Sequence, residues 1–139
     1  MRMKVLVTAS ALAVLVGTAA IAQERSTNLL TAVPENATTV TSYYKQSVYD
    51  PSDSKIGEVM DLLVQSDGKI AAAMVGVGGF LGIGEKDVAV SFDSLRLTTK
   101  NNKTFLVMST TKDALKAAPG FKYDRSTTHW VQDRSASTN

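Results

Sequence analysis

The segment from Val75 to Val90, VGVGGFLGIGEKDVAV, constrains the fold of this chain most. Five of the nine glycines lie within it, at Gly76, Gly78, Gly79, Gly82 and Gly84. Glycine adopts backbone conformations that are closed to other residues, and it lets a neighbouring segment approach closely. The segment therefore predicts a tight bend at the centre of the fold. A charged hinge, Glu85-Lys86-Asp87, follows it, and its charges could neutralise one another locally.

The spacing of these glycines argues against a phosphate-binding loop. From Gly76, the pattern G-x-G-x-x-G needs glycine at position 81, where Leu81 stands. From Gly79, the P-loop pattern reaches Gly84 but then needs lysine, where Glu85 stands. A carboxylate there would repel phosphate. We therefore interpret the glycines as structural residues of a hairpin bend and expect no cofactor.

Apolar side chains inside the bend form the candidate partner contact. Phe80, Leu81 and Ile83 either fold back over the end of a barrel or stay exposed to meet a partner. The sequence leaves both interpretations open.

The first 22 residues resemble an export signal. Arg2 and Lys4 precede an apolar run, and Ala20-Ile21-Ala22 has the small-x-small form of a cleavage site. An uncleaved anchor would need about 20 strongly apolar residues, whereas this run is diluted by polar residues and glycine. We expect cleavage after Ala22, a periplasmic or secreted protein, and no transmembrane span after cleavage.

Cleavage would change the charge balance of the chain. The full sequence carries 15 Lys and Arg against 13 Asp and Glu. Without Arg2 and Lys4, 13 basic residues face 13 acidic ones, so the mature chain is formally neutral and no nucleic-acid partner is expected. The chain has no cysteine, so packing and hydrogen bonds must hold it without disulfides.

After a polar, threonine-rich leader, the chain has the pattern of short strands joined by tight turns. Strands are expected at residues 47–49, 56–64, 70–77, 87–92 and 104–108. The Asp67-Gly68 turn is expected to place two residues at positive φ. Residues 70–77 include three alanines that favour helix, but their position between this turn and the glycine cluster favours a buried strand.

One short helix is expected near the end of the chain. Thr110-Thr111-Lys112-Asp113 is a capping-box pattern, in which Thr110 caps the helix and Asp113 reaches back. The helix covers residues 114–116 and ends before Pro119-Gly120. Residues 122–139 are polar apart from Trp130 and Val131, and we interpret them as a tail. Trp130 either pins this tail onto the barrel or contacts a partner.

No constellation of catalytic or metal-binding residues stands out. His129 is the only histidine, and with no cysteine it cannot build a zinc site without several carboxylates. An enzyme would need carboxylates that converge from separate turns, so we expect no enzymatic activity and no metal. The carboxylates near expected turns are interpreted as turn caps: Asp50, Asp53, Glu58, Asp61 and Asp67.

Three blocks of sequence resemble the PRC-barrel domain family. They are SVYD at residues 47–50, KIGEVMD at residues 55–61 and GGFLGIGEKDVAV at residues 78–90. The resemblance covers about residues 43–121, and members often carry proline where this chain has Ser91. It implies a small β-barrel used for docking or assembly, with no common catalytic residues. The family's roles in the photosynthetic reaction centre H subunit and in ribosome maturation are not expected here. We expect no membrane helix of the H-subunit kind, and export would remove the protein from ribosomes.

The sequence thus predicts a mainly β chain, a small, partly closed antiparallel β-barrel with one short C-terminal helix and flexible tails. The expected organisation is a signal peptide at 1–22, a flexible leader at 23–42, the barrel domain at 43–121 and a polar tail at 122–139. We expect a non-enzymatic interaction or assembly module of the periplasm or cell envelope whose partner is another protein. The alternative is a small-ligand or envelope-surface binding protein. Whether two copies pair through an uncovered edge strand is left open.

Overall fold

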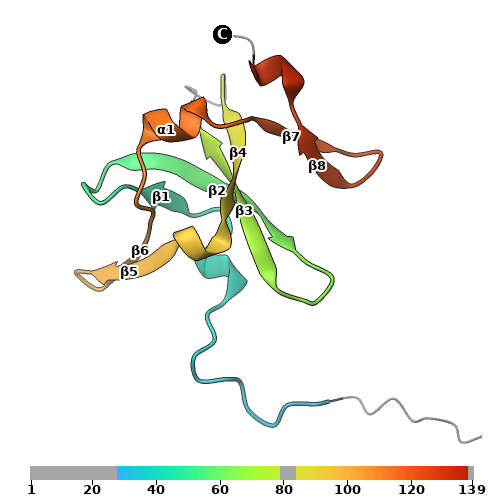
Figure 1. Ribbon diagram of the computed structural model, residues 1–139. Helices are drawn as coiled ribbons and strands as arrows, with labels where there is room; N and C mark the ends of the chain where they lie inside the picture. The colour runs from blue at the N-terminus through green and yellow to red at the C-terminus, as the bar shows by residue number, and fades with distance from the viewer. Residues whose placement is uncertain (1–27, 79–83, 138–139) are drawn as a thin grey trace, which may run out of the picture. The chain divides into compact units, whose positions relative to one another are not determined.

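The structure is a computed structural model that describes residues 28–78 and 84–137 (Figure 1). The contacts between residues divide the chain into two units, and the boundary in the sequence falls between Glu35 and Asn36. In the first unit, residues 28–35 carry no helix or strand, and their side chains are exposed. The strands and helices described below belong to the second unit.

Eight strands and one α-helix make up the described part of the second unit (Figure 1). They are accompanied by three short 3-10 helices, at Val40–Ser42, Phe92–Ser94 and Arg134–Ser137. The elements, in chain order, are β1 Ser47–Tyr49, β2 Lys55–Val64, β3 Ile70–Val77, β4 Lys86–Ser91, β5 Arg96–Lys100, β6 Lys103–Val107, α1 Lys112–Ala117, β7 Phe121–Asp124 and β8 His129–Gln132.

The strands form one sheet in the order β5-β6-β1-β2-β3-β4-β7-β8. Within the described residues, β1 and β6 run parallel and the other pairings are antiparallel. β5 and β8 end the sheet, so the barrel is only partly closed. The predicted fold class is confirmed: a mainly β, partly closed barrel with one short helix.

The core lies on one face of the three central strands. Val59, Val75 and Val88 stand in register on β2, β3 and β4, and each is 0% exposed. The expected alternation in β4 is confirmed, because Val88 is buried while the next residue, Ala89, is exposed. The helix alternative for residues 70–77 is wrong, since this segment is β3 and pairs with strands on both sides. Its position between two partners outweighs the helix preference of its alanines.

The hairpin turn at Asp67-Gly68 is present, but its conformation differs from the expectation. Of Asp67 and Gly68, only Gly68 has positive φ, at 86°, and its N–H donates to the carbonyl of Gln65 at 2.9 Å. This is a type I turn closed by a glycine in the left-handed region. The turn with two positive-φ residues lies between β5 and β6, where Asn101 and Asn102 have φ of 49° and 61°.

The N-cap lies one residue later than the capping-box interpretation placed it, and the helix, Lys112–Ala117, is longer at both ends than the expected residues 114–116. Thr111, not Thr110, is the N-cap residue, and its hydroxyl accepts a 3.1 Å hydrogen bond from the N–H of Ala114. Asp113 therefore lies inside the first turn, where its negative charge is favourable near the positive end of the helix dipole. The buried residue of α1 is Leu115, which joins the core cluster.

Residues 122–139, interpreted as a polar tail, contain an ordered hairpin. β7 and β8 pair in register from Phe121 with Gln132 to Asp124 with His129. β7 also joins the barrel sheet, because Asp87 on β4 pairs with Phe121. In the part of the chain that the structure describes, no helix has the length and apolar character needed to cross a membrane.

Candidate functional site

The glycine-rich segment joins β3 to β4 as a hairpin, as the sequence predicts. The two strands pair in register from Ala72 with Ser91 to Val77 with Lys86. Gly78 and Gly84 bound the bend with φ of 78° and 74°, values that L side chains rarely adopt. Gly79, Phe80, Leu81, Gly82 and Ile83 lie outside the described residues, so their role as bend glycines and partner contact stays a prediction.

Gly76 differs from the bend glycines, because it lies on the buried part of β3 and leaves room for the side chain of Glu85. Its φ is not positive, but a Cβ atom at this position would overlap the Oε1 atom of Glu85. Gly76 stands opposite Glu58 on β2 and opposite Asp87 on β4. Directly paired residues carry their side chains on the same face of a sheet. The carboxylates of Glu58 and Asp87 therefore lie on either side of the space above Gly76, and the side chain of Glu85 occupies that space.

A cleft of about 390 Å³ opens at this position. Four charged side chains line it, two of each sign: Lys55, Glu58, Glu85 and Lys112. Lys55 and Glu58 approach to 3.6 Å and form an exposed ion pair. Glu85 and Lys112 are exposed as well. The cleft therefore presents mixed charge on a floor of glycine backbone.

The charged hinge behind the bend does not neutralise itself, contrary to the sequence-based expectation. The ammonium group of Lys86 donates a 2.5 Å hydrogen bond to the carbonyl oxygen of Lys116, in the last turn of α1. The carbonyl end of a helix attracts cations, so Lys86 ties the helix to β4. Glu85 and Asp87 are left as neighbouring carboxylates.

The pKa of Asp87 is raised in this environment. Burial raises the pKa of its carboxyl group above the ordinary value, the nearby Glu85 raises it further, and Lys45 opposes them. Its Oδ1 atom is buried and, among the described residues, has no hydrogen-bond partner. Neither Asp87 nor Glu85 has a basic ion-pair partner in the described part of the chain.

Two of the five predicted turn caps are confirmed. Oδ1 of Asp50 accepts hydrogen bonds from the N–H groups of Ser52 and Ser54, at 2.8 and 3.0 Å. Oδ1 of Asp67 accepts from the N–H of Lys69 at 3.0 Å.

The other three carboxylates have different partners, so their interpretation as turn caps is wrong. Asp53 pairs with Lys100 at 2.6 Å, and Glu58 pairs with Lys55. Asp61 lies within β2, beside an irregularity in strand register, and accepts the indole N–H of Trp130 at 2.8 Å. Among the described residues, no group of three His, Asp or Glu side chains gathers as a metal site would require.

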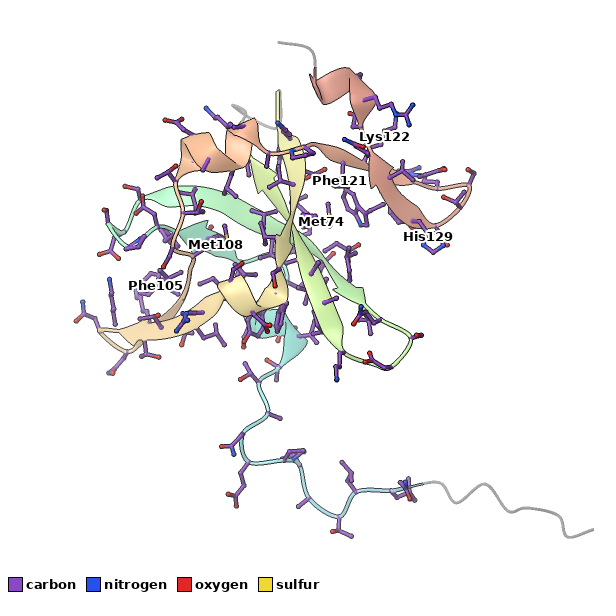
Figure 2. All side chains as sticks on the ribbon, viewed as in Figure 1. Met74, Phe105, Met108, Phe121, Lys122 and His129 are labelled. Atoms are coloured by element: carbon purple, nitrogen blue, oxygen red, sulfur yellow. The ribbon has the colours of Figure 1, made fainter. Side chains whose placement is uncertain are left out.

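A second cleft, of about 500 Å³, lies between β2 and the β7–β8 hairpin. Asp61, Val64, Tyr123 and Trp130 line it, together with the exposed His129, whose place on the hairpin is labelled in Figure 2. The sequence interpretation left two roles open for Trp130, and its bond to Asp61 shows that it pins the C-terminal segment to the barrel. The alternation of Phe121, Lys122 and Tyr123 was a signal for this hairpin that the polar character of the segment concealed.

Comparison with protein families identifies the domain. The model of the PRC-barrel domain matches residues 35–115, from the end of the first unit through β1–β6 and into α1. A search of curated proteins found no match. The matched residues include Gly76 and every residue that lines the first cleft. The β7–β8 hairpin and its side of the second cleft lie beyond them.

Proposed function

The chain belongs to the PRC-barrel domain family, and from this premise we propose that it is a non-enzymatic interaction or assembly module of the periplasm or cell envelope. Its partner is another protein. Three features support the proposal: the family membership, the mixed-charge cleft at Gly76, and the export signal that the first 22 residues resemble.

The cleft at Gly76 is the observation that carries the proposal. Lys55, Glu58, Glu85 and Lys112 place both signs of charge within one cleft of about 390 Å³. A polyanion such as nucleic acid would be repelled by half of these groups. A protein surface can match both signs, and such complementarity selects the partner and speeds its encounter more than it adds affinity.

The bend itself supplies the apolar part of the proposed contact. Phe80, Leu81 and Ile83 follow Gly78, which lines the cleft, and precede Gly84 and Glu85. Interfaces commonly combine an apolar centre with a charged rim. We propose that these three residues form that centre and that the cleft charges form the rim.

A matched pair of charge reversals tests this contact. Lys112→Glu reverses a cleft charge at the first position of α1, where a carboxylate suits the helix N-terminus, so folding is preserved. Lys103→Glu makes the same change at the exposed start of β6, outside the cleft. Each tagged protein is expressed in its host and crosslinked in the cell envelope, and captured proteins are quantified by mass spectrometry.

We expect Lys112→Glu, and separately Phe80→Asp with Leu81→Asp, to reduce the same captured proteins at least about fivefold. That factor corresponds to about 1 kcal/mol of lost binding. Lys103→Glu should leave them unchanged. A capture profile that is equal in all variants would reject this surface as the partner contact.

Export is tested independently of the partner. Fractionation of host cells should place the protein outside the cytoplasm, and the purified protein should begin at Gln23, directly after the Ala20-Ile21-Ala22 motif. An intact N-terminus in the cytoplasmic fraction would refute the proposed location, whatever the capture experiment shows.

A small-ligand binding protein is the second candidate, and the volumes of the two clefts favour it. They measure about 390 and 500 Å³, within the range of small-molecule sites. Native mass spectrometry of protein taken directly from its host tests this candidate, because a retained ligand adds its own mass. Protein of the unmodified mass at gentle desolvation would argue against it.

A further inference from the structure

The cleft between β2 and the β7–β8 hairpin has an apolar wall that faces solvent. Tyr123 is 47% exposed and Val64 is 63% exposed. The rings of Tyr123 and Trp130 pack edge to face with centroids 5.8 Å apart. Two aromatic rings fixed against each other offer a rigid surface whose π-faces attract cations.

Asp61 places a carboxylate at the same cleft. Oδ1 accepts the N–H of Leu62 and Oδ2 accepts the indole N–H of Trp130, each at 2.8 Å. Both donors are neutral, and no Lys, Arg or His in the described ranges forms an ion pair with Asp61. The carboxylate is thus held in one orientation while its negative charge stays uncompensated.

We propose that this cleft binds the guanidinium group of an arginine on an extended partner polypeptide. A guanidinium is planar, so it stacks on the exposed ring of Tyr123, which Trp130 supports edge to face, while its N–H groups donate to Asp61. The ammonium group of lysine is a point charge with no planar surface that could stack on a ring. A neutral sugar cannot neutralise the charge of Asp61. The cleft therefore selects arginine over both.

The edge position of β8 is the reason for assigning a polypeptide rather than a free cation. β8 ends the sheet, so one edge of His129–Gln132 has no strand partner among the described residues. Trp130 lies on this strand and lines the cleft. An extended segment that pairs with β8 would gain main-chain hydrogen bonds and bring an arginine within reach of Asp61.

This site is independent of the contact proposed at the glycine bend. The two clefts share no lining residue. The hairpin also lies outside the residues matched by the family model. Failure of the capture experiment at Lys112 would therefore leave this inference standing, and the reverse also holds.

Trp130 is the only tryptophan of the chain, so its indole ¹H–¹⁵N resonance reports on this cleft alone. The probe is the peptide acetyl-Thr-Val-Arg-Val-Thr-amide, titrated at low salt into the protein. The matched peptides replace arginine with citrulline, which has nearly the same shape without the charge, or with lysine. Acetyl-arginine-amide and an N-acetylglucosamine trisaccharide complete the set.

We expect the arginine peptide to bind at least about tenfold more tightly than the citrulline peptide and several-fold more tightly than the lysine peptide. It should also bind at least about fivefold more tightly than acetyl-arginine-amide. Equal affinity for arginine and citrulline, or a preference for the saccharide, would overturn the cation assignment. Equal affinity for the peptide and acetyl-arginine-amide would overturn the polypeptide assignment.

Two variants test whether the arginine peptide binds in this cleft. Asp61→Asn keeps an oxygen acceptor for Trp130 but removes the charge, and it should weaken the arginine peptide at least about tenfold without changing citrulline binding. Tyr123→Leu keeps apolar volume but removes the ring, and it should weaken the arginine peptide about threefold or more. Wild-type affinity in Asp61→Asn, with a well-dispersed spectrum, would refute the proposal.

Discussion

The indole N–H of Trp130 donates a 2.8 Å hydrogen bond to Oδ2 of Asp61, 69 residues earlier in the chain. This bond fixes the β7–β8 hairpin, which the family model does not cover, to strand β2, which it does. Asp61 stands in register with Met74, which is 0% exposed although it does not belong to the main core cluster. We infer that the hairpin shields this outer face of the sheet.

Trp130→Phe should loosen the hairpin while the barrel persists. The variant keeps an aromatic ring but removes the donor to a charged acceptor, and we expect a loss of about 1–2 kcal/mol for the hairpin's local opening. Hydrogen exchange of the β7–β8 amides measures this opening.

The matched control is Asp61→Asn, which retains an acceptor and should cost less than half as much. Unchanged exchange protection in Trp130→Phe would show that packing alone holds the hairpin.

The sequence could not reveal this hairpin's attachment, for a physical reason. Asp61 and Trp130 are joined by tertiary structure across most of the domain, and no local pattern encodes their distance. Local strand signals were sufficient to place the central strands β3 and β4. The alternation around Val88 placed β4, and the flanking turn and glycines placed β3 despite its alanines.

Thr111→Ala should destabilise the protein by about 1 kcal/mol, the usual cost of losing an N-cap oxygen. Its hydroxyl accepts the N–H of Ala114 at 3.1 Å, and alanine leaves that donor without a partner at the start of α1. Thr110→Ala should change stability by only a few tenths of this amount. Urea unfolding of the two variants compares them, and an equal or reversed ranking would contradict the observed helix start.

The one-residue error in the predicted cap has a simple origin. Thr110 and Thr111 are chemically identical candidates, and capping preferences cannot distinguish neighbours of the same type. With Thr111 as the cap, the helix buries Leu115 in the core cluster, a tertiary contact that the local capping pattern does not contain. The turn at Asp67-Gly68 is similar, because its dipeptide fits two turn types, and the register of the flanking strands selects between them.

Two buried glycines should respond very differently to alanine. A Cβ on Gly57 would lie 2.6 Å from Cγ1 of Val75 and 2.8 Å from the carbonyl oxygen of Gly76. Neither neighbour can yield without moving the sheet, so Gly57→Ala should cost about 2–3 kcal/mol. At Gly76 the overlapping atom is the carboxylate end of the exposed Glu85 side chain, which can swing away.

We therefore expect Gly76→Ala to cost less than about 1 kcal/mol. The double variant with Glu85→Ala should recover most of that loss, because it removes the overlapping group. Denaturant unfolding gives both values. A Gly76→Ala cost as large as that of Gly57→Ala would show that Glu85 is held more firmly over the glycine than its exposure indicates.

Asp87→Asn should stabilise the protein at neutral pH. Burial and the adjacent Glu85 raise the pKa of Asp87 in the folded state above its ordinary value of 3.8. In the pH interval between these two values, the folded protein binds more protons than the unfolded chain. Stability therefore falls as pH rises through this interval, and the loss is complete above the raised pKa. Asparagine cannot ionise, so it avoids this loss.

The stability difference between Asp87→Asn and the wild type should be smallest below pH 3.8, should grow as pH rises, and should then level off. Because Asp87 is partly exposed and solvent screens its charge, we expect a plateau of roughly half a kcal/mol. Urea unfolding of both proteins from pH 3 to 7 measures the difference, in which the titration of other groups cancels. Glu85→Gln should lower the pKa of Asp87 and reduce the plateau, because Glu85 is the second cause of the shift after burial. A difference that shrinks with rising pH would mean that Asp87 gains a stabilising partner when it ionises, which its unpaired Oδ1 atom argues against.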